Sequence, residues 1–168
     1  MRDAFPEGAR RAAVSGTEGS SPASWLIIGI GSPVAGDDLG WLAIGWLHNA
    51  GFDRHADLVT LDRPGTALLD HMQPGSQVIL IDAMDADLAP GTILELPLED
   101  LIITARPPSS HEFGLAETLA LAKALGTLPH RCHVIGIQMG RWPGDPKGRD
   151  RDPEHLAWLI HRIMAQKS

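Results

Sequence analysis

Two carboxylates and one imidazole stand at places in this sequence where a metal site can form. Asp38 ends a glycine-rich stretch, Asp82 follows four consecutive apolar residues, and His111 lies in a segment rich in proline and serine. Carboxylate oxygens and an imidazole nitrogen suit zinc, nickel or manganese, and three such ligands leave coordination positions open for water and substrate. These residue types therefore favour metal-assisted hydrolysis.

Each of these residues also has an interpretation without function. Asp38 could be an acidic residue at a helix N-terminus, where Asp37 is the better cap candidate. A carboxylate at the mouth of a buried strand must be solvated, paired or bound, which favours function for Asp82. A loop histidine is more often a plain surface residue, so His111 is a candidate metal ligand only because the two acids accompany it. The other histidines lack such company, and we interpret them as surface or structural residues.

The elements that would position these residues alternate between strand and helix. Apolar runs predict strands at 25–30, 57–61, 78–81 and 133–137, with an edge strand that has an antiparallel neighbour at 92–96. Helical spacing and stop signals predict helices at 38–50, 67–72 and 112–125, and a last helix capped by Asp152. We therefore expect an α/β fold, a three-layer αβα sandwich with a twisted, mostly parallel five-stranded sheet and helices on both faces. Ligands of such sheets bind at the carboxyl ends of the strands, where Asp38, Asp62 and Asp82 would lie.

Composition narrows the class of protein. A chain of 168 residues with 43% hydrophobic content suits a single domain, expected at 25–168 after a flexible tail at 1–24 that lacks the apolar core of a signal peptide. A net charge of -7 argues against nucleic acid as a partner. The lone Cys132 excludes an internal disulfide and favours the cytoplasm, and no apolar run is long enough to predict a membrane span. We expect a monomer.

Two other kinds of site fit the sequence poorly. Gly29 and Gly31 before a helix resemble the start of a dinucleotide fingerprint, but the third glycine comes too late and Pro33 interrupts the turn. A nucleophilic hydrolase lacks a Gly-x-Ser-x-Gly elbow, and Cys132 begins a buried strand rather than an activating loop.

Four segments, in order, resemble the maturation endopeptidases of nickel-iron hydrogenases, and the resemblance covers most of the chain from Leu26 to Met164. The matching segments are the glycine-rich loop with its acidic pair at 29–38, Asp-Arg-Pro-Gly-Thr at 62–66, Asp-Ala at 82–83 and Ser-Ser-His-Glu-Phe-Gly-Leu at 109–115. This sequence departs from the family pattern at Ser32, usually asparagine, and at Arg63 and Pro64, which replace a pair of glycines.

The resemblance implies a metal-dependent, aspartic-type endopeptidase that removes a C-terminal extension from the hydrogenase large-subunit precursor after nickel insertion. It implies Asp38, Asp82 and His111 as metal contacts, Asp38 and Asp82 as catalytic residues, and a supporting loop of Gly29, Gly31, Asp37, Asp62 and Thr66. In that family the nickel belongs to the substrate, so zinc or cadmium could substitute in the isolated protein. A non-catalytic docking module for a metalloprotein precursor stays open as an alternative, and so does a dinucleotide-binding protein.

Overall fold

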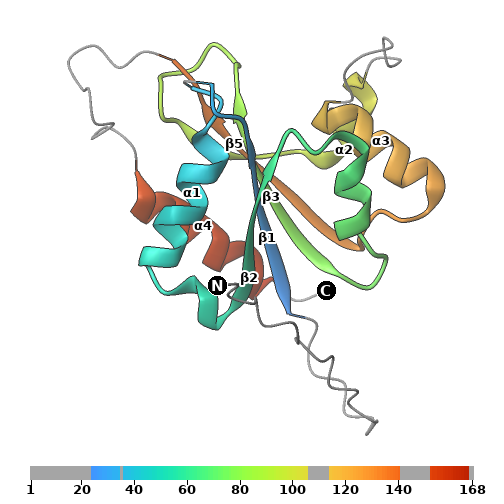
Figure 1. Ribbon diagram of the computed structural model, residues 1–168, viewed down its shortest axis with the longest axis horizontal. Coiled ribbons are helices and arrows are strands. Elements are labelled where there is room, and N and C mark those ends of the chain that lie inside the picture. The colour runs from blue at the N-terminus through green and yellow to red at the C-terminus, as the bar shows by residue number, and fades with distance from the viewer. Residues whose placement is uncertain (1–23, 35, 106–113, 141–151, 167–168) are drawn as a thin grey trace, which may run out of the picture.

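Five strands form one sheet in the order β2-β1-β3-β5-β4 (Figure 1). The computed structural model of the chain describes residues 24–34, 36–105, 114–140 and 152–166. The strands are β1 Trp25–Gly31, β2 Ala56–Asp62, β3 Gln77–Met84, β4 Ile93–Leu96 and β5 Arg131–Gln138. β4 pairs antiparallel with β5 at one edge of the sheet, and the other neighbouring pairs are parallel. The predicted mostly parallel sheet with its antiparallel edge strand is confirmed.

Helices cover both faces of this sheet, which confirms the predicted three layers (Figure 1). On one face lie α1, Leu39–Asn49, and α4, Pro153–Ala165. On the other lie the 3₁₀ helix η2, Gly65–His71, and the helices α2, Leu98–Thr104, and α3, Leu115–Leu125. A second 3₁₀ helix, η1, Phe52–Arg54, follows α1.

The central strands are apolar on both faces because both faces are covered. Ile79 belongs to the hydrophobic core beneath α1 and α4, whereas Val78 and Leu80 belong to the core beneath η2 and α3. Successive side chains of a strand point to opposite faces, so Asp82 shares the face of Val78 and Leu80. The sequence of β3 therefore directs this carboxylate to the η2 and α3 side.

Helix α1 lies unusually close to the sheet because glycines meet at the contact. A Cβ atom added to Gly40 would stand 2.0 Å from the carbonyl oxygen of Ile30, and one added to Gly29 would stand 2.1 Å from the carbonyl oxygen of Gly40. Trp41 adds a hydrogen bond from its ring nitrogen to the carbonyl oxygen of Leu61, at 2.9 Å. These contacts fix the start of α1 against the carboxyl ends of β1 and β2.

The structure differs from the predicted elements in a few places. The short helix predicted at 67–72 is a 3₁₀ helix over 65–71, and α2 and η1 were not predicted. The sequence carried a signal for α2, since Glu99 and Asp100 stand in its first turn, where acidic residues favour the helix dipole. The cap predicted for α4 is confirmed, because the Asp152 carboxylate accepts a hydrogen bond from the His155 amide at 2.8 Å. No helix in the described part of the chain combines the length and apolar character that a bilayer span requires.

Candidate active site

A cavity of about 520 Å³ opens at the carboxyl ends of the parallel strands. β2 lies on one side of β1 and β3 lies on the other, so the direction in which strands are added to the sheet reverses at β1. Open α/β sheets bind ligands at such a switch point. The cavity is lined by the end of β1, the loop before α1, the connection from β2 into η2, one residue of β3 and the start of α3. Its lining residues are Ile30, Gly31, Asp37, Arg63, Pro64, Gly65, Thr66, Leu68, Asp82, Gly114, Leu115 and Thr118.

Asp82 brings a carboxylate into this cavity from within β3, two residues before the strand ends. The Ala83 amide donates a hydrogen bond to it at 2.8 Å. Burial raises the pKa of Asp82 to about 7, the Ala83 amide opposes that shift, and the negative charge of Asp37 adds to it. A carboxyl group that titrates near neutral pH can exchange a proton during a reaction at that pH.

Asp37 brings a second carboxylate into the same cavity. The fully buried Ser32 hydroxyl donates a hydrogen bond to this carboxylate, and the Ser32 amide donates to the Asp37 carbonyl at 3.0 Å. The Asp37 amide donates to the Val34 carbonyl, also at 3.0 Å. Gly31 leaves room for this turn, because a Cβ there would stand 2.6 Å from the Asp37 carbonyl oxygen. The loop after β1 thus holds Asp37 in one place.

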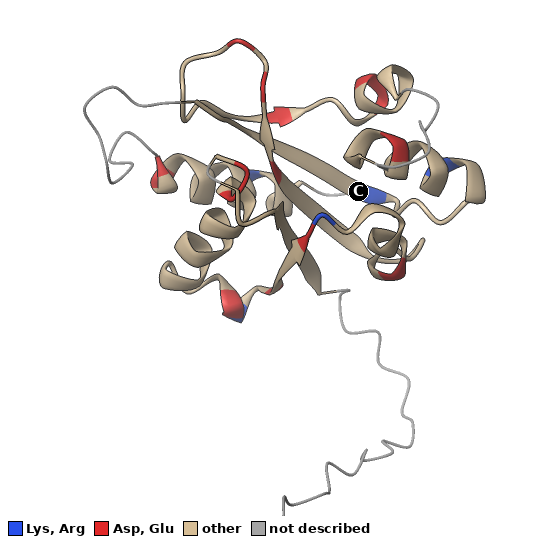
Figure 2. Cartoon of the chain, turned by 45° about the horizontal axis from the view of Figure 1, so that its top comes forward, with Lys and Arg blue, Asp and Glu red and all other residues tan. Residues whose placement is uncertain are grey.

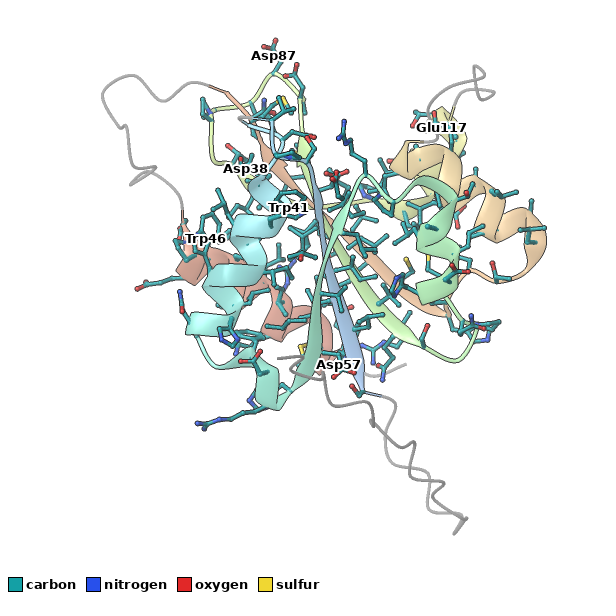
Figure 3. The ribbon with its side chains drawn as sticks, in the orientation of Figure 1. Asp38, Trp41, Trp46, Asp57, Asp87 and Glu117 are labelled. Carbon is teal, nitrogen blue, oxygen red and sulfur yellow. The ribbon has the colours of Figure 1, made fainter. Side chains whose placement is uncertain are left out.

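Asp38 occupies the N-cap position of α1 and does not line the cavity. Its carbonyl accepts a hydrogen bond from the Leu42 amide at 3.0 Å, and its side chain makes no cap hydrogen bond. The prediction that Asp37 caps the helix is therefore wrong by one residue. Figure 3 shows Asp38 at the N-terminal end of α1. Of the acidic pair, it is Asp37 that the structure brings together with Asp82 in the cavity.

His111 lies outside the described residues, and its proposed role as a metal contact stays a prediction. Gly114, three positions later in the sequence, lines the cavity. Among the residues that the structure describes, no group of three or more histidine, cysteine, aspartate or glutamate side chains could hold a metal ion.

The supporting residues predicted from the sequence have different places. Gly29 and Gly31 serve close packing of β1 against α1 and its preceding loop, and Thr66 lines the cavity. Asp62 ends β2, is largely exposed and accepts a hydrogen bond from Nε of Arg63 at 3.1 Å. Sequence reasoning missed Arg63 as a lining residue, although a charged residue where the family pattern has glycine was a signal.

The single cysteine is unsuited to nucleophilic chemistry. Burial raises the pKa of the Cys132 thiol to about 12, so the thiol stays protonated at neutral pH. His133, its neighbour on β5, makes a 2.7 Å contact from Nδ1 to the Glu95 carboxylate on β4, a structural role.

Comparison with known proteins assigns a family to this chain. The family model described as hydrogenase maturation protease matches residues 55–144. The chain belongs to the hydrogenase maturation protease family. The chain is similar to the hydrogenase expression/formation protein HupM of Azotobacter chroococcum mcd 1, with 34% identity over 125 residues that cover 71% of this chain and 59% of HupM. It is also similar to HoxM of Azotobacter vinelandii, with 34% identity over 119 residues, 67% of this chain and 56% of HoxM. The matches thus span little more than half the length of these relatives.

Solved structures of hydrogenase maturation proteases share the fold. HycI from Thermococcus kodakarensis KOD1 superposes with a TM-score of 0.55 at 20% identity, covering 88% of this chain and 96% of HycI. HybD from E. coli superposes with a TM-score of 0.53 at 19% identity, covering 84% of this chain and 87% of HybD. At these identities the likeness shows a common fold.

Proposed function

We propose that this chain is an endopeptidase that removes the C-terminal extension of a nickel-iron hydrogenase large-subunit precursor after nickel insertion. Membership of the hydrogenase maturation protease family supports the reaction and its protein partner. We also propose that the protein acts in the cytoplasm, as a monomer, and without nucleic acid or membrane as a partner.

One observation supports this function more than any other. Asp37 and Asp82 contribute two carboxylates to one cavity at the carboxyl ends of the strands. A cavity of about 520 Å³ has room for a short peptide segment but not for a folded domain. An extended end of a precursor chain is therefore a suitable occupant.

In the proposed mechanism the nickel arrives with the substrate and serves as its recognition mark. Carboxylates of the cavity and His111 complete the shell of that nickel and hold the scissile peptide beside it. Held there, the nickel would polarise the peptide carbonyl or activate a water molecule. A carboxylate of the cavity would take the proton of the attacking water and pass it to the nitrogen that leaves as the peptide C–N bond breaks. Asp82 is suited to this proton transfer because burial raises its pKa to about 7 in the metal-free protein, so its carboxyl group can exchange a proton near neutral pH.

The second carboxylate comes from the acidic pair. The family resemblance assigns the metal contact to Asp38, whereas the lining of the cavity favours Asp37. Asp38 is the N-cap of α1 and Asp37 stands one residue before it, so the two candidates are neighbours in the same turn.

The test is cleavage of a purified precursor loaded with nickel, followed by mass spectrometry of both products. We expect a single cut that releases the C-terminal extension, no cut in the metal-free precursor, and loss of cleavage in Asp82→Asn and His111→Ala. Asp57→Asn is a matched control, because Asp57 lies on β2 at the end of the molecule opposite Asp38 (Figure 3). Undiminished cleavage by Asp82→Asn would contradict the mechanism.

The alternative is a docking module that holds the precursor without cutting it. It predicts tight binding of a nickel-loaded precursor that stays full length under reducing conditions. The raised pKa of Asp82 favours catalysis over docking, because perturbed carboxyl groups in cavities are typical of catalytic sites.

A further inference from the structure

Arg63 has a backbone conformation that its residue type does not favour. Its φ is 37°, and the only other non-glycine residue with positive φ in the described chain is Asp87. In this region the Cβ atom of an L-residue clashes with its own backbone, so glycine is the usual choice. The Arg63 amide donates a hydrogen bond to the Gly31 carbonyl at 3.0 Å, which a glycine could do equally well. The backbone thus gives no reason for an arginine here, and strain kept at a cavity indicates a role for the side chain.

The guanidinium of Arg63 can donate further hydrogen bonds to a ligand in the cavity. The residue lines the cavity, and its side chain is 65% exposed. Its Nε bonds to the neighbouring Asp62 carboxylate at 3.1 Å, while neither terminal nitrogen has a hydrogen-bond partner among the described residues. Two terminal nitrogens in one plane can bind a carboxylate through parallel hydrogen bonds.

The charges around the cavity differ in sign from one part to another. Asp37 and Asp82 are acidic, whereas Arg63 is the basic residue of the lining. Basic positions are the minority in this chain, with 14 Lys and Arg against 21 Asp and Glu, and Figure 2 shows acidic positions on many elements. A ligand that complements such a cavity carries a cation for the two carboxylates and an anion for the guanidinium.

We propose that Arg63 is a specificity-determining residue that binds a carboxylate of the substrate segment entering the cavity. The proposal rests on the proposed function: the metal held by the precursor meets the acidic residues, and an acidic group of the same segment meets Arg63. The carboxylate is either an acidic side chain of the extension or its terminal carboxylate. Arg63 selects precursors by this group and takes no part in the bond that breaks.

Three substitutions at this position separate charge from backbone strain. Arg63→Ala removes the charge and keeps the strained backbone, Arg63→Gly removes both, and Arg63→Lys keeps both. Without the guanidinium, we expect the Kd of the precursor and the KM of cleavage to rise roughly ten- to hundredfold in the Ala and Gly variants, with a smaller rise for Lys. Relief of strain should raise the Tm of Arg63→Gly above wild type by about 2–4 °C, so stability and substrate binding move in opposite directions. Arg54→Ala, at the exposed Arg54 of η1, is the control and should change neither quantity.

Altered precursors identify the carboxylate. One precursor carries amides in place of the acidic side chains of its extension, and another carries a short glycine-serine addition that moves the terminal carboxylate away. The precursor that lacks the bound carboxylate should bind wild-type protein as weakly as the unaltered precursor binds Arg63→Ala. Arg63→Ala should bind the unaltered precursor and the precursor that lacks this carboxylate with the same Kd. Such non-additivity is expected of two groups in contact.

The outcomes keep this inference apart from the proposed function. Cleavage with unchanged KM and unchanged Kd in Arg63→Ala and Arg63→Gly would overturn the role of Arg63 and leave the peptidase intact. Binding that depends on Arg63 without cleavage would support the inference and contradict the peptidase. If Arg63→Ala raised the Kd by the same factor for every precursor, amidated or not, Arg63 would attract the precursor by its charge without binding one particular carboxylate. That result would also overturn the role proposed here.

Discussion

The carboxylates of Asp37 and Asp82 line the same cavity, and the charge of Asp37 contributes to the raised pKa of Asp82. Asp37 lies in the loop that follows β1, and Asp82 lies on the adjacent strand β3. The negative charge of Asp37 disfavours the ionised form of Asp82, and a positive charge placed near both carboxylates would favour it.

The pH dependence of stability should change when Asp82 is replaced by asparagine. The folded pKa of about 7 lies above the ordinary value of 3.8, so the folded state holds the proton more tightly than the unfolded chain. Stability from this group is complete below about pH 4 and is lost as the pH rises through about 7. The loss is at most about 4 kcal/mol, and less where solvent screens the charge. Urea unfolding of both proteins from about pH 4 to pH 8 should show a steeper decline for wild type. Parallel curves would show that Asp82 titrates normally.

Two single substitutions can show whether Asp37 or Asp38 is the residue that acts in cleavage. Because Asp37 lines the cavity and Asp38 does not, Asp37→Asn should lower kcat/KM for the nickel-loaded precursor about a hundredfold or more, and Asp38→Asn should lower it less. Both variants keep side chains of nearly equal size, and circular dichroism checks that α1 is intact. The opposite ranking would support the assignment of Asp38 by family resemblance.

The sequence predicts some parts of this site better than others, for physical reasons. Asp82 could be placed because the apolar run before it predicts a buried strand, and the acid marks the carboxyl end of that strand. The choice between Asp37 and Asp38 could not be made, because neighbouring acids have nearly equal preference for a helix N-terminus. The Ser32 hydrogen bond and the positive φ of Arg63 depend on how the turns pack together, which local preferences do not determine. Helix α2 spans only seven residues, fewer than the roughly 11-residue window in which helical periodicity is recognised, although Leu98, Leu101 and Ile102 have helical spacing and pack against the core.

Ser32 should act as a positioning residue for Asp37. Its buried hydroxyl donates to the Asp37 carboxylate and accepts from the Val34 amide at 3.4 Å, so Ser32→Ala leaves polar groups without that partner. We expect a loss of about 1–3 kcal/mol in the free energy of unfolding, together with lower kcat. A purely structural role predicts the same kcat loss whether or not Asp37 is present. In the double variant with Asp37→Asn, we expect Ser32→Ala to have little further effect on kcat. Additive losses would contradict the positioning role.

Two glycines of α1 provide a matched pair for testing how α1 packs against the sheet. A Cβ added to Gly40 would lie 2.0 Å from the Ile30 carbonyl oxygen and 2.6 Å from that of Ile81, so Gly40→Ala must push α1 away from β1 and β3. Forcing atoms into a packed contact costs about 1–3 kcal/mol, and we expect the upper part of that range because backbone atoms cannot move aside easily. The same substitution at Gly45 meets no atom within 4 Å, and alanine there should stabilise the helix by up to about 1 kcal/mol. Since Asp37 lies just before α1, Gly40→Ala should also lower cleavage, whereas Gly45→Ala should leave cleavage unchanged. Equal unfolding midpoints for the two variants in urea would show that α1 does not approach the sheet as closely as the glycine contact requires.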